Sequence, residues 1–166
     1  MNMLIISAVT ALIPLLIGFI WYNPKVFGNT WMKGAGLTEE SMKGANMALI
    51  FGLTYFLSFL IAFGLHSITI HQFGLFGLLQ PEQGYTDPAG AIDTLNGVAA
   101  QFATKFRTFR HGVIHGTING IAILLPVCAI NGLFERRGWK YILINAGYWI
   151  ISTALMGGVI CQFSKM

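Results

Sequence analysis

The sequence predicts an all-α fold: an integral membrane four-helix bundle with an additional amphipathic interfacial helix before the third span. Composition is the first observation, because 55% of the 166 residues are hydrophobic and only 10% are charged. Soluble domains carry about 25% charged residues. The second observation is that four stretches lack any charged residue: 1–24, 44–81, 111–134 and 141–164. A spanning helix needs about 20 apolar residues, so each stretch can cross a bilayer.

The first span is expected over 2–22. It is expected to remain as a helix and not to be cleaved as a signal peptide, because no positive residue precedes its apolar part. Pro14 lies in its middle, removes a backbone hydrogen bond and predicts a kink. Asn23-Pro24 ends the helix. Thr38, followed by two carboxylates, starts the second helix, whose span is expected over 44–66.

An outer loop and the amphipathic helix are expected over 72–110. Asp87-Pro88 is a strong start signal for this helix. Apolar side chains then recur at helical spacing, namely Ile92, Leu95, Phe102, Phe106 and Phe109. We expect the helix to lie in the membrane interface or to pack on the spans as a lid. The third span is expected over 111–134, with a kink at Pro126, and the fourth over 141–162. The chain is therefore predicted to form a single transmembrane domain over 1–166.

Basic residues gather at the ends of the spans, where they anchor and orient a membrane protein. The net charge of +4 therefore does not indicate a nucleic-acid partner. One side carries Lys25, Lys33, Lys43, Arg136, Arg137 and Lys140, and the other carries Lys105, Arg107, Arg110 and Lys165. The more basic side favours the cytoplasm, so both termini are predicted on the outer, periplasmic side of the cell inner membrane.

The third span opens with HGVIHGTING, in which a polar residue and a glycine recur every four residues. Four-residue steps drift by about 40° around a helix, so His111, His115 and Asn119 share one face. We expect this stripe to face protein or a water-filled gap, since lipid offers it no hydrogen bonds. Polar partners on the fourth span complete the predicted intramembrane stripe: Asn145, Tyr148 and Ser152.

The glycines of the same stretch form a second stripe that lets another backbone approach closely. These residues are Gly112, Gly116 and Gly120. A matching stripe of small residues is expected on the second helix, to pack against the third helix or against another subunit: Gly44, Ala48 and Gly52. The sequence therefore predicts a homo-oligomer held through glycine-rich helix faces.

No catalytic set is apparent, because the spans contain no acid to orient a base. The favoured interpretation is a non-enzymatic structural, accessory or regulatory membrane component without a cofactor, with a protein partner in the bilayer. A channel or transporter for a small solute, lined by the stripe of His111, His115 and Asn119, is an alternative. A third is a metal or haem site, because histidines four residues apart on one helix can share a metal. Its candidate ligands are His66, His71, His111 and His115.

Two stretches carry a family resemblance. WYNPKVFGNTWMKGAGLTEE (21–40) resembles the early part of DUF1761, a bacterial membrane family of unknown function, and NGLFERRGWKYILINAGYWIISTALMGGVI (131–160) is similar to its closing part. His115-Gly116 is a third piece, whereas 74–110 matches nothing. The resemblance implies a small four-span protein of the bacterial inner membrane and carries no established activity or ligand set.

Overall fold

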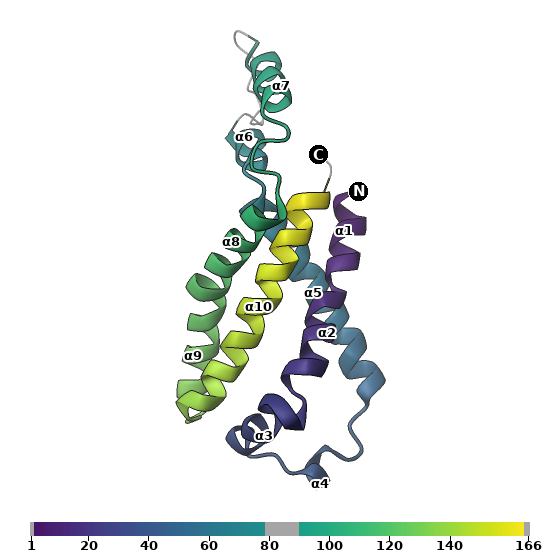
Figure 1. The fold of residues 1–166 in the computed structure, drawn as a ribbon, viewed down its shortest axis with the longest axis vertical. Coiled ribbons are helices and arrows are strands. Elements are labelled where there is room, and N and C mark those ends of the chain that lie inside the picture. The colour runs from purple at the N-terminus through teal and green to yellow at the C-terminus, as the bar shows by residue number, and fades with distance from the viewer. Residues whose placement is uncertain (1, 79–89, 165–166) are drawn as a thin grey trace, which may run out of the picture.

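The computed structural model describes residues 2–78 and 90–164, and these residues form helices and no strand (Figure 1). Four of the helical segments are long and apolar enough to cross a membrane. They are α1 with α2 (Met3–Thr10 and Leu12–Trp21), α5 (Met47–Thr69), α8 with η2 and α9 (Phe109–Asn119, Gly120–Leu124 and Leu125–Phe134), and α10 (Trp139–Phe163). The all-helical membrane prediction is confirmed.

Polar side chains fix where the spans begin. Asn2, Asn46 and Thr108 each accept a hydrogen bond from a backbone N–H of the first turn that follows them, at 3.0–3.2 Å. Such caps satisfy donors that have no partner within the helix. The second span therefore starts at Met47 and not at residue 44. The Thr38 cap is present, but it begins a separate short helix, α4 (Glu39–Met42), and not the span itself.

Both prolines within the spans lie beside a break in the regular helix. The first span is divided at Ala11, three residues before Pro14, whose ring leaves the carbonyl of Thr10 without its usual partner. In the third span a π-helical turn, η2, immediately precedes α9, in which Pro126 is the second residue. Insertions of this kind accommodate a missing backbone hydrogen bond.

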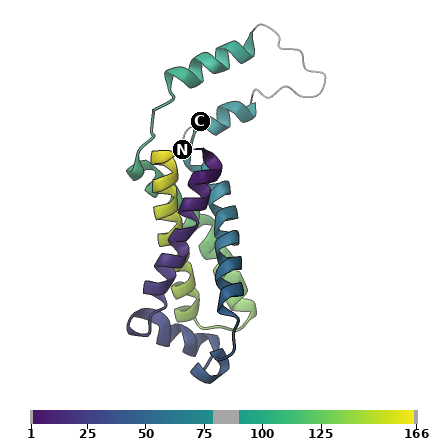
Figure 2. The same cartoon turned by 90° about the vertical axis from the view of Figure 1, so that its right-hand side faces the viewer.

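The shorter helices lie at the two ends of the spans. At the end opposite the termini lie η1 (Pro24–Gly28), α3 (Asn29–Ala35) and α4, and at the end of the termini lie α6 (Gln72–Leu78) and α7 (Ala91–Gln101) (Figures 1 and 2). The amphipathic helix is shorter than predicted. It ends at Gln101 because the chain turns there, with Phe106 at a φ of +63°. The predicted start at Asp87-Pro88 lies outside the described residues.

The central helix of the assembly is α10. Half of its apolar stretch (50%) is buried within the chain, compared with 17% for α5 and 17% for the third span. Its Met156 and Ile160 pack with Ile6 of α1 and Leu65 of α5 in a fully buried cluster. The other spans turn leucine, isoleucine and phenylalanine side chains outward, as expected of helices whose solvent is lipid.

Candidate functional site

The glycine stripe of α8 and η2 packs directly on α10. A Cβ added at Gly112 would collide with the backbone of Gly157, and one added at Gly116 would collide with the backbone of Thr153. At Gly120 it would lie 2.7 Å from Cα of Ile150. The Oγ1 of Thr153 also donates a hydrogen bond to the carbonyl of Gly116 at 3.0 Å. The predicted close approach of backbones is therefore present, and its partner is α10.

The small residues of the second helix do not take part in this packing. Gly44 precedes α5, in a turn with a φ of +90°, so it cannot belong to a helical stripe. Ala48 is exposed, and a Cβ added at Gly52 would meet nothing within 4 Å among the described residues. The expectation that this face packs against the third helix is wrong, because α10 occupies the glycine stripe instead. Packing of Ala48 and Gly52 against another subunit stays a prediction.

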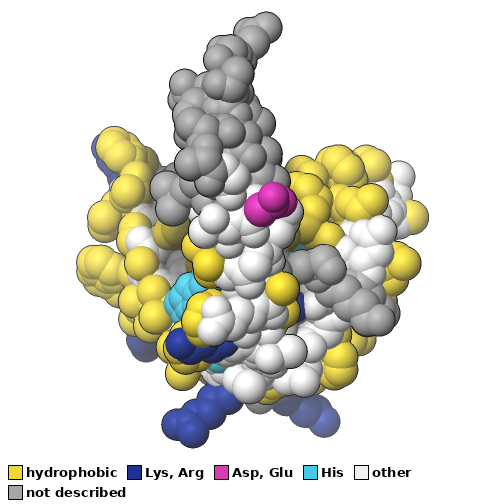
Figure 3. Space-filling model, turned by 90° about the horizontal axis from the view of Figure 1, so that it is seen from above, with side chains coloured by type: hydrophobic (Ala, Val, Ile, Leu, Met, Phe, Trp, Pro, Cys, Tyr) yellow, Lys and Arg dark blue, Asp and Glu magenta, His cyan; other side chains and the backbone are white. Residues whose placement is uncertain are grey.

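Three histidines meet at the end of the spans that carries the termini. His71 lies between α5 and α6, and His111 and His115 lie one turn apart on α8. The Nε2 atoms of His71 and His111 are 2.9 Å apart. Across the three side chains, one ring nitrogen of each lies within 4.8 Å of the others. Histidine side chains reach the surface at this end of the molecule, beside hydrophobic and basic side chains (Figure 3).

The glycine stripe explains how α8 presents its histidines. Because Gly112 and Gly116 face α10, the residues that precede them point about 100° around the helix. This direction leads to the C-terminal end of α5, where His71 follows. The centroid of the His71 ring lies 4.8 Å from that of His115, and the His111 and His115 centroids are 4.5 Å apart. The repeat of one histidine and one glycine per turn of α8 thus places the imidazoles of His111 and His115 beside that of His71.

The turn between α7 and α8 forms one wall of this cluster. The Phe106 ring stacks on His111, with centroids 5.0 Å apart and an interplanar angle of 17°, and it meets the edge of His71 at 5.8 Å. Gln72 holds the turn in place, because its Nε2 donates to the carbonyls of Phe102 and Lys105 at 2.8 and 3.2 Å. Sequence reasoning assigned Phe106 to an amphipathic helix and missed this role.

His66 lies apart from the three histidines. It is 1% exposed, its Nδ1 is 3.0 Å from the carbonyl oxygen of Ala62, and its ring meets Phe73 edge-on. The Nε2 atom has no hydrogen-bond partner among the described residues. Of the four histidines named as candidate ligands, the structure brings together His71, His111 and His115 and leaves His66 in the core.

The rest of the predicted polar stripe does not continue from the histidines. Tyr148 donates to the carbonyl of Pro14 on α2 at 2.9 Å, and Ser152 is fully buried in the same helix, α10. Asn119 is 8% exposed at the end of α8. Asn145 lies near the opposite end of the spans. Tyr148 of α10 therefore joins the first span to the fourth, and the stripe forms no continuous surface among the described residues.

Asn145 is the centre of a polar cluster at that opposite end. Its Oδ1 accepts hydrogen bonds from the Tyr22 hydroxyl at 3.0 Å and from the Trp31 Nε1 at 3.1 Å. Its Nδ2 donates to the carbonyl of Tyr141 at 3.1 Å. Burial raises the pKa of the Tyr22 hydroxyl above its ordinary range, so the group remains a neutral donor. Through these contacts α10 holds both the end of α2 and the short helix α3.

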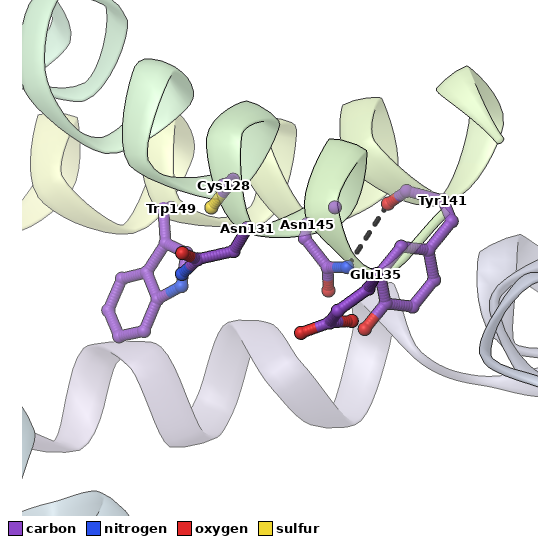
Figure 4. Close-up of a pocket in the computed structure, with 7 residues that line it drawn as sticks. Cys128, Asn131, Glu135, Tyr141, Asn145 and Trp149 are labelled. Carbon is purple, nitrogen blue, oxygen red and sulfur yellow. Dashed lines mark hydrogen bonds between the residues drawn. The ribbon is translucent and has the colours of Figure 1, made fainter. Parts of the chain in front are cut away.

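A cavity of about 200 Å³ opens beside Asn145 (Figure 4). Asn145 and Trp149 come from α10, and Cys128 and Asn131 come from α9. The carboxylate of Glu135 closes one side and lies 3.5 Å from Nε of Arg137. This cavity was not predicted. Apart from Glu135, its residues lie on α9 and α10, and the sequence does not say which sides of these two helices face each other. Asn131 and Asn145, within otherwise apolar spans, were the available signal.

Comparison with known proteins identifies a family for the chain. The family model described as a protein of unknown function (DUF1761) matches residues 5–161, which is nearly the whole chain. No curated protein and no solved structure matches the chain.

Proposed function

The chain belongs to the DUF1761 family, whose function is unknown, and we propose that it is a membrane protein that binds one transition-metal ion. The ligands are His71, His111 and His115. The observation that carries this proposal is the convergence of three imidazoles, two from the third span and one from the turn that follows the second, with ring nitrogens within 4.8 Å of one another. By contrast, His66 is buried in the core and belongs to no such cluster.

The chemistry of the cluster suits a zinc-class ion. Neutral imidazole is a common ligand for Zn²⁺, and tetrahedral coordination with bonds of 2.0–2.1 Å holds nitrogens about 3.3 Å apart. The 2.9 Å separation of the His71 and His111 Nε2 atoms lies close to that value, and a ring nitrogen of His115 lies within 4.8 Å of both residues. Three protein ligands leave a fourth position for water or another molecule.

Haem receives less support from this geometry than a single ion does. A haem iron with two histidine ligands requires a flat macrocycle between their rings. Here the rings of His71, His111 and His115 contact one another, with centroids 4.5–5.0 Å apart. A macrocycle between them would have to separate rings that now touch.

The other two hypotheses are an oligomer held by the glycine stripe and a channel lined by the polar stripe. In the structure, the residues of both stripes make other contacts. The main glycine stripe, proposed as an oligomer interface, is filled by α10 of the same chain. A channel would be lined by the stripe of His111, His115 and Asn119. However, His115 contacts His71, His111 stacks on Phe106, and Asn119 is 8% exposed at the end of α8. Both readings therefore receive less support than metal binding, which we propose as a binding role and not as a catalytic one.

We further propose that the metal site faces the periplasm of a bacterial cell. The end of the spans with α3 and α4 carries most of the basic residues, which favours the cytoplasmic side. Both termini lie at the other end, as do the end of α5 and the start of α8, where the three histidines lie in the chain (Figure 1). On this orientation the protein takes its ion from outside the inner membrane.

The direct test is metal content. The protein is purified in mild detergent, stripped with a chelator, incubated with ZnCl₂ and dialysed, and its zinc is measured by mass spectrometry. We expect about one ion per chain. His71→Gln, His111→Gln and His115→Gln should each weaken zinc binding by about tenfold or more, because each removes a ligand.

The matched control is His66→Gln, which changes the one remaining histidine. It should keep the zinc stoichiometry of the wild type, because His66 lies outside the cluster. Wild-type protein without retained zinc would overturn the proposal. So would variants at the three ligand positions that bind zinc as well as the control.

A further inference from the structure

A second, larger cavity lies at the end of the spans opposite the histidines, with a volume of about 480 Å³. It is formed between α3 and the first turn of α10, and it shares Tyr141 with the cavity beside Asn145. The residues that line it are Asn29, Thr30, Lys33, Gly34, Gly138, Lys140 and Tyr141.

The charge around this cavity is positive. Lys33 and Lys140 reach it from two different elements, and none of the lining residues carries a carboxylate. Arg137 adds a third cation at its edge, because its Nη1 donates to the carbonyl of Gly34 at 3.3 Å. Glu135 lines the other cavity, where it lies beside Arg137. Thr30 and Asn29 supply a hydroxyl and an amide, which can donate hydrogen bonds to an anion.

The walls of the cavity are held in place by packing. Trp31 stacks on Tyr141, with centroids 6.5 Å apart, and its Nε1 is hydrogen-bonded to Asn145. A Cβ added at Gly34 would lie 2.8 Å from the Cβ of Tyr141, so the glycine allows α3 to approach α10 closely. The space between Lys33 and Lys140 is therefore set by the fold.

The residues beside the cavity at the start of α10 are of the types that gather at the level of lipid headgroups. Lys140 is the second residue of α10, and its neighbours Trp139 and Leu143 expose 61% and 55% of their surfaces. Tryptophan and lysine at the end of a spanning helix mark the level between acyl chains and water. An anion held between the two lysines can thus carry acyl chains that extend along the apolar side of α10.

We propose that this cavity binds the phosphate group of an anionic phospholipid. Basic pockets between spanning helices on the cytoplasmic side recognise such headgroups through charge. Lys33 and Lys140 pair with the phosphate, and Thr30 and Asn29 donate to its oxygens. The site is independent of the three histidines, since it lies at the other end of the spans.

Lipid binding can be counted directly by native mass spectrometry of the full chain released from detergent. The probes are phosphatidylglycerol, phosphatidylcholine and inorganic phosphate. We expect the wild type to retain phosphatidylglycerol in preference to phosphatidylcholine. Lys33→Gln combined with Lys140→Gln should weaken phosphatidylglycerol binding by about tenfold or more, since each lysine near a membrane surface contributes about 1 kcal/mol.

The control is Lys25→Gln combined with Lys43→Gln, which removes the same charge from the same end, at residues that do not line the cavity. It should keep the wild-type preference, as should Lys33→Arg combined with Lys140→Arg. Equal loss of lipid binding in the Lys25 and Lys43 control would overturn the site. It would mean that the lipid is attracted by the overall positive charge of this end of the molecule and not by the two lysines of the cavity. Unchanged binding in the Lys33 and Lys140 glutamine variant would do the same. Displacement of the lipid by inorganic phosphate at equal concentration would overturn the lipid as its ligand.

Discussion

Two glycines on different spans have opposite surroundings, although both were predicted to pack against a helix. Gly116 faces the carbonyl of Thr153 so closely that no side chain fits. Gly52 on α5 has nothing within 4 Å of an added Cβ among the described residues. The same substitution should therefore have very different effects at the two positions.

Gly116→Leu should lower the apparent unfolding temperature in detergent by roughly 5 °C or more, because overpacking against backbone costs at least about 1–3 kcal/mol. Gly52→Leu is the matched control and should change it by less than about 2 °C. Both are measured by circular dichroism or by a thermal aggregation assay. Equal stability of the two variants would mean that α8 does not pack on α10 as described.

The histidines illustrate how far a residue can be assigned from sequence. The four-residue repeat predicted that His111 and His115 lie on one helix face beside a glycine stripe, and they do. The position at which α5 ends decides that His71 joins these two histidines and that His66 does not. Helix α5 stops at Thr69, so His66 stays inside it and His71 lies beyond it, in the turn toward α6. From sequence, the end of this span was predicted at residue 66, three residues before the helix ends.

At the scale of whole elements, the spans were predictable because a bilayer requires long runs without charge. The short elements were not. Helix α3 lies between the predicted end of the first helix at Pro24 and the predicted start of the second at Thr38, where no helix was predicted. It is held by the distant contact of Trp31 with Asn145, which no local pattern encodes. The amphipathic helix was extended too far, because the recurrence of apolar residues continues past the point where the chain turns.

The turn between α7 and α8 also caps the C-terminal end of α10 through Arg107. The guanidinium of Arg107 donates to the carbonyls of Cys161, at 2.9 Å, and of Ser164, which lie at the C-terminal end of α10. Cations are favoured there by the helix dipole. Partial burial lowers the pKa of Arg107, but a guanidinium remains protonated at any physiological pH. In return, Gln162 of α10 accepts from the backbone N–H of Phe109, so each helix end caps the other.

For the whole molecule, the structure places α3 and α4 at one end, and both termini, the end of α5 and the start of α8 at the other (Figures 1 and 2). By their positions in the chain, most of the basic residues belong to the first end and the three clustered histidines to the second. If positive charge selects the cytoplasm, a phosphatase fused to the C-terminus should be active in the periplasm. A green fluorescent protein at the same position should remain dark. Bright fluorescence of that fusion would reverse the orientation and place the histidines on the cytoplasmic side.

The most direct test of the account concerns the environment of the bound ion. X-ray absorption at the zinc edge, on the reconstituted full chain, reports the atoms around the metal. Coordination by His71, His111 and His115 predicts imidazole nitrogens at about 2.0–2.1 Å, with the outer-ring scattering typical of histidine, and its loss in His111→Gln. A spectrum with oxygen neighbours alone, or one that His111→Gln leaves unchanged, would contradict metal binding at this cluster.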